Sequence, residues 1–161
     1  MFRWHMLWMT GRGQTVVTVG DSGTIRHSSD AGGNWFARSS GTNFDLLDVD
    51  CIALTNCWAV GESGTILKST DTGATWSPVN SDTNEPLRDV EFANPGVGWI
   101  VGDRGTILHT TDGGDSWSPQ PNVSVEPFYG LSFVDASNGW VAGNSSPAKV
   151  MEYDGVTGDL V

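Results

Sequence analysis

A repeat of 41 residues constrains the fold of this chain more than any other feature of its sequence. The stretch from Thr106 to Trp117 reads Thr-Ile-Leu-His-Thr-Thr-Asp-Gly-Gly-Asp-Ser-Trp, and related stretches run from Thr65 to Trp76 and from Thr24 to Trp35. A fixed period of this size is typical of stacked or circular arrays of small structural units. We therefore expect one repeat domain without internal linkers.

Each copy carries the pattern Ser/Thr-x-Asp-x-Gly-x-x-Trp between two β-rich runs, which predicts a tight turn between antiparallel strands. The Asp can accept hydrogen bonds from nearby backbone amides, and the Gly allows a backbone conformation that other residues resist. We expect each Trp ring to be buried between neighbouring sheets. The residues of the three turns are Ser28, Asp30, Gly32 and Trp35; Ser69, Asp71, Gly73 and Trp76; and Thr110, Asp112, Gly114 and Trp117.

Four short strands are expected in every unit. In the clearest unit they lie at 87–92, 99–102, 106–110 and 116–118, which is the design of a propeller blade. The sequence thus predicts an all-β propeller of four blades, at about 4–41, 42–82, 83–123 and 124–161. The last unit departs from the pattern, because the turn at 144–147 differs and the closing Trp is missing.

Blades must close a ring or have their end faces covered, because an exposed strand edge invites aggregation. Three arrangements are open: a four-bladed ring, an eight-bladed ring of two chains, and an open arc covered by a partner. We expect a homo-oligomer or a partner-covered edge rather than a closed monomer.

The repeat resembles two known families. Ser/Thr-x-Asp-x-Gly-x-x-Trp resembles the Asp-box (BNR) of sialidase-type repeats. The longer unit, Val-Gly-Asp/Glu-x-Gly-Thr-Ile-Leu followed by that turn and Trp, is similar to the propeller repeat of the photosystem II assembly and stability factors. The second resemblance implies a non-catalytic scaffold that binds another protein, with a membrane protein as client.

Charge and hydropathy exclude several kinds of partner. The net charge of −11 argues against nucleic acids and anionic membrane surfaces, both of which require a basic face. No run reaches the roughly 20 apolar residues of a membrane span, so we expect no direct membrane insertion. The opening residues 1–9 read as a strand rather than as a signal peptide.

Cys51 and Cys57 flank the expected turn of one hairpin, so their side chains could meet across it. A disulfide and a pair of reduced thiols are both open, whereas the spacing does not fit a zinc site. A disulfide would place the protein in an extracytoplasmic setting: periplasm, lumen, medium or a virion surface.

Asp21, Glu62 and Asp103 recur in the turn between the second and third strands, and Arg104 follows the last of them. In a propeller this turn lies on the face opposite the Asp-box turns, so these residues are candidates for binding a basic partner segment or a cation. Solvated turn residues are the alternative. His27, Lys68 and His109 share another column, which we expect to face solvent.

No arrangement of residues compels a reaction. Sialidases require an arginine triad and a nucleophilic Tyr beside a Glu, and the six arginines and two tyrosines of this chain do not map onto such a site. We therefore expect no enzyme activity, cofactor or metal. The two functional hypotheses are a protein-binding scaffold and an exposed structural or receptor/glycan-recognition module on a cell or virion surface.

Overall fold

The chain forms four antiparallel sheets of four strands each, in a computed structural model that describes residues 4–6, 15–52, 55–121, 125–143, 150–154 and 159–160. In every sheet the strands are hydrogen-bonded in chain order, which is the topology of a propeller blade. The all-β propeller fold expected from the repeat is confirmed. The turn at 144–147 and the end of the last Asp-box-like segment lie outside the described residues.

We name the sheets blades one to four. Blade one contains β1 (Trp4–Met6), β2 (Val16–Gly20), β3 (Thr24–Ser28) and β4 (Phe36–Arg38). Blade two contains β5 (Leu46–Ile52), β6 (Asn56–Gly61), β7 (Ile66–Ser69) and β8 (Ser77–Val79). Blade three contains β9 (Leu87–Asn94), β10 (Val97–Gly102), β11 (Ile107–Thr110) and β12 (Ser118–Pro119). Blade four contains β13 (Phe128–Phe133), β14 (Asn138–Gly143), β15 (Val150–Asp154) and β16 (Asp159–Leu160).

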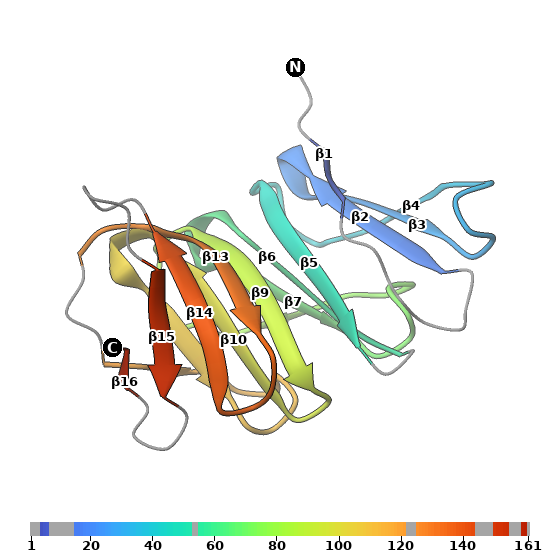
Figure 1. The fold of residues 1–161 in the computed structure, drawn as a ribbon. Coiled ribbons are helices and arrows are strands. Elements are labelled where there is room, and N and C mark those ends of the chain that lie inside the picture. Colours follow the sequence, from blue (N-terminus) through green and yellow to red (C-terminus); the bar gives the residue numbers. More distant parts are fainter. Residues whose placement is uncertain are drawn as a thin grey trace.

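The blades follow one another in a row, with blade one and blade four at its opposite ends (Figure 1). The first strands of successive blades, β5, β9 and β13, lie side by side along the inner face of this row. Three short 3-10 turns, η1 (Asp21–Gly23), η2 (Glu62–Gly64) and η3 (Asp103–Gly105), connect the second and third strands of blades one to three.

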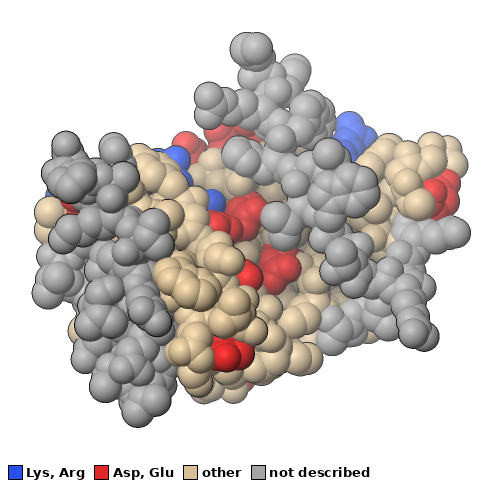
Figure 2. All heavy atoms as spheres, in the orientation of Figure 1, with Lys and Arg blue, Asp and Glu red and all other residues tan. Residues whose placement is uncertain are grey.

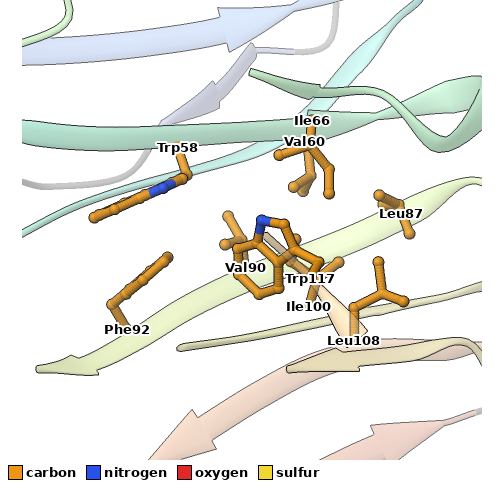
Figure 3. Close-up of a cluster of buried hydrophobic side chains, with 9 residues drawn as sticks. All are labelled: Trp58, Val60, Ile66, Leu87, Val90, Phe92, Ile100, Leu108 and Trp117. Carbon is orange, nitrogen blue, oxygen red and sulfur yellow. The ribbon is translucent and has the colours of Figure 1, made fainter. Parts of the chain in front are cut away.

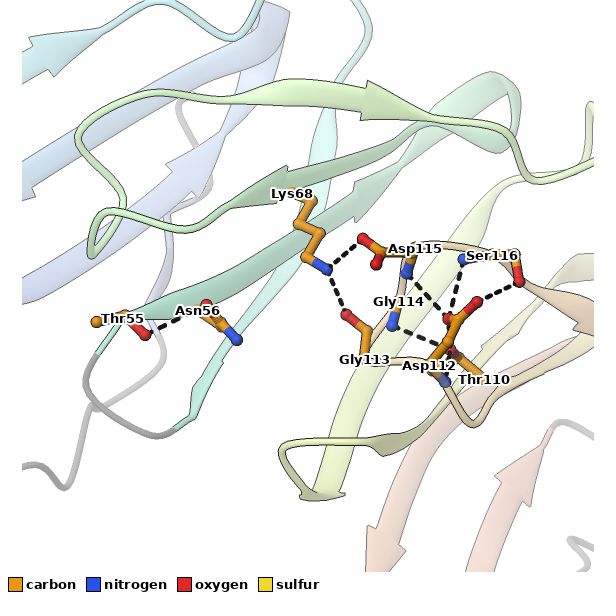
Figure 4. A network of polar contacts seen from close by, with 9 residues as sticks. All are labelled: Thr55, Asn56, Lys68, Thr110, Asp112, Gly113, Gly114, Asp115 and Ser116. Carbon is orange, nitrogen blue, oxygen red and sulfur yellow. Dashed lines mark hydrogen bonds and ion pairs between the residues drawn. The ribbon is translucent and has the colours of Figure 1, made fainter.

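The turns that carry the Asp motif, which we call Asp turns, are held by the carboxylate. In blade two, Asp71 accepts hydrogen bonds from the Ser69 hydroxyl (2.8 Å), the Thr75 amide (2.8 Å) and the Thr75 hydroxyl (2.6 Å). These bonds favour the ionised carboxylate, so the pKa of Asp71 falls to about 2, with the Thr75 hydroxyl as the largest cause. Asp112 makes the same set of contacts with Thr110 and Ser116 (Figure 4), and Asp30 differs only in that the side-chain amide of Asn34 donates in place of the second hydroxyl.

A hydrophobic core fills the junction between blades two and three. Trp58 of β6 stacks on Phe92 of β9 with ring centres 3.6 Å apart, and Trp117 meets the edge of the Phe92 ring at 5.7 Å (Figure 3). The next junction repeats the stack, because Trp99 of β10 lies 3.7 Å from Phe133 of β13. Such stacked pairs contribute about 0.5–1.5 kcal/mol beyond the area that they bury.

The junction between blades one and two is built differently. Cys51 and Cys57 form a disulfide across β5 and β6, at the position where β9 and β10 pair Phe92 with Gly98. Val17 stands opposite His27 in blade one, where Trp58 stands opposite Lys68 in blade two. A small side chain thus faces the compact disulfide, whereas a large indole faces the phenyl ring.

The three motif tryptophans do not share one environment, so the prediction that each ring is buried is wrong for Trp35. Trp117 is 5% exposed and Trp76 packs against the core of blades one and two, but Trp35 is 39% exposed. The reason is that the motif indole packs toward the preceding blade. No described blade lies on that side of blade one.

The column of His27, Lys68 and His109 does not face solvent either. His27 is buried, and Lys68 extends from β7 to the Asp turn of blade three, where its ammonium donates to the Gly113 carbonyl and to Asp115, both at 2.7 Å (Figure 4). The same ammonium lies 5.7 Å from the centre of the Trp58 ring. The column therefore belongs to the junctions between blades. The alternation of side chains along one strand could not predict this, because it carries no information about contacts with a neighbouring blade.

Truncation of Trp117 to Ala should lower the free energy of unfolding by about 3–5 kcal/mol, because it opens a cavity in the core between blades two and three. The matched change Trp35→Ala should cost under about 1 kcal/mol, because that ring is already exposed. Urea unfolding followed by circular dichroism measures both. Equal losses in the two variants would contradict the assignment of Trp117 to a junction.

The Asp turns should make stability fall in acid. Asp71 has a lowered pKa in the folded chain, so its contribution is present above the unfolded value near 4 and is lost as pH falls toward about 2. Asp71→Asn should lower the melting temperature at pH 7 and flatten its decline between about pH 4 and pH 2. Asp82→Asn, a change at an exposed loop carboxylate, should alter neither; an unchanged acid profile for Asp71→Asn would refute the role of the turn.

Candidate functional site

A hollow of about 570 Å³ opens on the inner face of the row, and all four blades contribute to it. We call it the inner hollow. Its lining residues are Asp21, Asp45, Leu47, Asp48, Arg88, Asp89 and Tyr129. Figure 2 shows acidic side chains gathered in the hollowed middle of this face. A concave surface with a few convergent charged groups is where a ligand is expected to bind.

Arg88 is the cation among these lining residues, and it is firmly oriented. Its guanidinium donates two hydrogen bonds of 2.8 Å to the Asp103 carboxylate and lies 5.5 Å from the centre of the Tyr129 ring. The bond to Asp103, the charge of Asp103 and the nearby Glu62 raise the pKa of Arg88 further. Tyr129 is half-exposed, so one side of its ring is available for a ligand.

Of the four residues expected on the binding face, three lie at or beside the inner hollow and one lies elsewhere. Asp21 lines the hollow, and Asp103 and Glu62 act on Arg88 beside it. Arg104 points away, because it pairs at 3.4 Å with Glu85 and lines a separate, smaller depression. Of the predicted residues only Asp21 lines the hollow, and the sequence analysis did not single out Tyr129, Asp48 or Asp89.

Carboxylates on the inner strands join the blades below the hollow, in an arrangement that we call the carboxylate ladder. Asp48 and Asp50 of β5 accept hydrogen bonds from the backbone amides of Val90 (3.0 Å) and Phe92 (2.8 Å) in β9. One blade further on, Asp89 and Glu91 accept from the amides of Leu131 (2.7 Å) and Phe133 (3.1 Å) in β13. In blade four the same register positions hold Gly130 and Ser132, so the ladder ends there.

Burial changes the protonation of the ladder. The pKa of Asp48 rises to about 9, chiefly because the carboxyl is buried and also because it shares a hydrogen bond with, and is repelled by, Asp89. Burial raises the pKa of Asp50 and of Glu91 as well. The floor of the hollow is therefore less negative at neutral pH than a count of its carboxyls implies.

Two features are absent from the described part of the chain. Among those residues, no three His, Cys, Asp or Glu side chains are grouped so that they could hold a metal ion. Within the same residues, no helix is long and apolar enough to cross a membrane.

A signal in the sequence could have located the ladder. Acidic residues occupy alternate positions of two inner strands, Asp48 and Asp50 in one unit and Asp89 and Glu91 in the next. Alternate residues of a strand face the same side of a sheet, so each pair had to project toward one neighbour.

Comparisons with known proteins agree with this architecture. The family model described as photosynthesis system II assembly factor YCF48 matches residues 73–155. The structure of YCF48 bound to a D1 peptide is similar with a TM-score of 0.74 and 19% identity, over 99% of this chain and 55% of that one. YCF48 from Cyanidioschyzon merolae gives a TM-score of 0.65 and 17% identity, over 80% of this chain and 44% of that one.

An enzyme shares the same architecture. An ancestral GH74 enzyme is similar with a TM-score of 0.79 and 14% identity, over 97% of this chain and 23% of that one. At these identities the solved structures establish the fold alone. This chain spans about half the length of the two YCF48 chains. A search of curated protein sequences found no match.

Replacement of Asp48 by Asn should change how stability depends on pH. The folded pKa of Asp48 is raised, so the folded chain holds a proton that the unfolded chain releases, and stability falls as pH rises from about 4 to about 9. Asn keeps an oxygen for the Val90 amide but cannot ionise. The melting temperature of Asp48→Asn minus that of the wild type should therefore be larger at pH 8 than at pH 5. For the exposed control Asp82→Asn this difference should be the same at both pH values. A pH profile of Asp48→Asn that runs parallel to that of the wild type would contradict the buried, protonated state of Asp48.

Proposed function

Since the chain belongs to the family of photosynthesis system II assembly factor YCF48, we propose that it is a non-catalytic, protein-binding propeller unit that holds a segment of another polypeptide in the inner hollow. The observation that carries this proposal is the composition of the hollow, where four blades bring an oriented cation, a half-exposed aromatic ring and several carboxylates to one concave surface. A related YCF48 has been solved with a D1 peptide.

The chemistry of the hollow favours a basic, extended segment. Asp21, Asp45 and Asp89 line it together with one arginine whose charge is already paired with Asp103. A Lys or Arg of the client would meet these carboxylates, and an apolar or cationic side chain would pack on the Tyr129 ring. As the family implies, the client is a subunit of a membrane-protein complex.

The inner carboxylates support a non-catalytic role. Glycosidases place two carboxyls roughly 5–9.5 Å apart, on either side of the bond to be broken. Asp48 and Asp89 instead share a hydrogen bond, and each accepts a backbone amide of the next blade. Both carboxyls thus take part in holding neighbouring blades together.

The disulfide and the acidic charge support the remaining parts of the proposal. A disulfide between Cys51 and Cys57 persists in oxidising surroundings, so we place the protein outside the cytoplasm. A net charge of −11 disfavours nucleic acid as a partner. The open ends of the row are covered in the working assembly, by a partner or by another copy.

Peptide binding tests the proposal directly. A labelled D1 peptide and a lysine-substituted version of it are titrated with the protein by fluorescence anisotropy. We expect the more basic peptide to bind more tightly and to weaken with salt. Tyr129→Ala should weaken binding about 5- to 30-fold, because the ring supplies packing and a cation–π contact of about 1–2 kcal/mol.

The matched control is Phe36→Ala, because Phe36 is an equally exposed aromatic on β4, outside the hollow. It should bind as the wild type does. Equal binding by Tyr129→Ala and wild type would remove the hollow as the site. Binding to a glycan array that Tyr129→Ala abolishes, without peptide binding, would favour the surface-recognition hypothesis instead.

A further inference from the structure

One side chain on the third strand of a blade lies against the Asp turn of the following blade. In blade two this residue is Lys68, whose ammonium donates hydrogen bonds of 2.7 Å to the Gly113 carbonyl and to the Asp115 carboxylate of blade three (Figure 4). One repeat of 41 residues earlier, the same position of blade one holds His27. The two junctions thus use the same position with different chemistry.

His27 lies in the contact between blades one and two but lacks the anionic partner found at the next junction. The Asp turn of blade two packs beside it, because a methyl group added at Gly73 would lie 2.6 Å from Val17, which pairs with His27. His27 is 6% exposed, and its Nε2 has no hydrogen-bond partner among the described residues. Ala74 takes the place of Asp115 in this turn, so it offers His27 no carboxylate at that position.

Arg38 of β4 holds the other nitrogen of the imidazole ring. Its guanidinium lies 3.4 Å from Nδ1 of His27, and Nδ1 is the acceptor because an arginine can only donate. A ring that accepts at Nδ1 is neutral, whereas a protonated ring donates from both nitrogens. Protonation of His27 therefore replaces this hydrogen bond by two cations that face each other.

The surroundings of His27 disfavour its charged form. Burial is the largest cause that lowers its pKa, and the charge of Arg38 is the second. Asp71 and the Thr72 backbone, both in the Asp turn of blade two, act in the opposite direction but less strongly. The Asp71 carboxylate is already engaged by the hydroxyl and amide donors of its own turn. The neutral ring is therefore the form that fits this junction.

We propose that His27 is an acid-sensitive element of the fold, which loosens the contact between blades one and two when its ring takes up a proton below neutral pH. The protonated ring loses its bond to Arg38 and meets Ala74 rather than a carboxylate, so it is more stable in water than in the junction. Opening of the Asp turn of blade two away from blade one lets water reach the ring. The next junction does not open in this way, because Asp115 is the partner of the cation there.

This element also bears on the inner hollow. Asp21 of blade one lines the hollow, and the backbone amide of Ser22 donates to the Asp45 carboxylate at 2.7 Å. A loosened blade one therefore withdraws a carboxylate from the hollow and breaks a hydrogen bond at its rim. This consequence rests on the proposed peptide binding, whereas the opening of the junction does not.

Hydrogen exchange at pH 7.5 and pH 5.5, followed by mass spectrometry and corrected for intrinsic exchange rates, tests the proposal. The folded pKa of His27 is lowered, so its contribution to the junction is present above about 6.5 and is lost as pH falls through that value. The equilibrium constant for opening should rise several-fold, up to about tenfold, in β3 and in the Asp turn of blade two. The Asp turn of blade three should show no such rise.

Two substitutions separate the effect of the proton from an effect of packing. His27→Gln keeps a side-chain acceptor for Arg38 but cannot titrate, so opening of this junction should no longer depend on pH. The matched control His109→Gln, two blades away, should respond to acid at this junction as the wild type does. Ala74→Asp supplies the carboxylate that blade three has in Asp115, so it should weaken or reverse the response.

The outcomes distinguish this inference from the proposed function. A wild-type junction that opens equally at both pH values would overturn the inference, as would an acid response that persists in His27→Gln. Circular dichroism checks that each variant is folded, and Ala74→Asp provides the test if His27→Gln is not. A junction that opens in acid while the labelled D1 peptide binds at neither pH supports this inference and overturns the proposed function.

Discussion

Contact between neighbouring blades is the interaction on which the rest of this structure depends. A single four-stranded sheet buries little, and the largest buried side chains, Trp58 and Trp99, lie between sheets rather than within one. At the junction of blades two and three, stacked rings, the Asp turn and two carboxylate–amide bonds occur together. Stability in such an array is approximately a sum of units and nearest-neighbour junctions. The inner hollow exists because these junctions hold four blades at fixed angles.

The local structure could be predicted from the sequence because it is set by short-range chemistry. The spacing of Asp71, Gly73 and Trp76 encodes the hydrogen bonds and the backbone conformation of a turn, and its repetition encodes the blades. What could not be predicted depends on neighbours. Trp35 has the same motif as Trp117 but lacks a blade to pack on, and Lys68 reaches a turn 45 residues away. The lining of the hollow comes from four separated segments, so no window of the sequence contains it.

The junction between blades one and two indicates how far the repeat can vary while keeping its geometry. Val17 and the Cys51–Cys57 disulfide replace an indole and a phenyl–glycine pair at the same register positions. Both solutions fill the space between two sheets, one with stacked rings and one with a covalent cross-strand link beside a small side chain. Each difference taken alone makes its blade look irregular. Together they match, because the small side chain of blade one faces the compact disulfide of blade two.

The carboxylate ladder gives the row a direction. Every carboxylate in it belongs to the earlier blade and every amide to the later one, so acceptors always point toward the C-terminal side. Head-to-tail surfaces of this kind can add subunits without limit and grow into filaments when their rotation does not close. In blade four the corresponding positions hold Gly130 and Ser132, so no carboxylate continues the ladder there. An array built on this ladder therefore cannot be extended beyond blade four by the same pair of carboxylates.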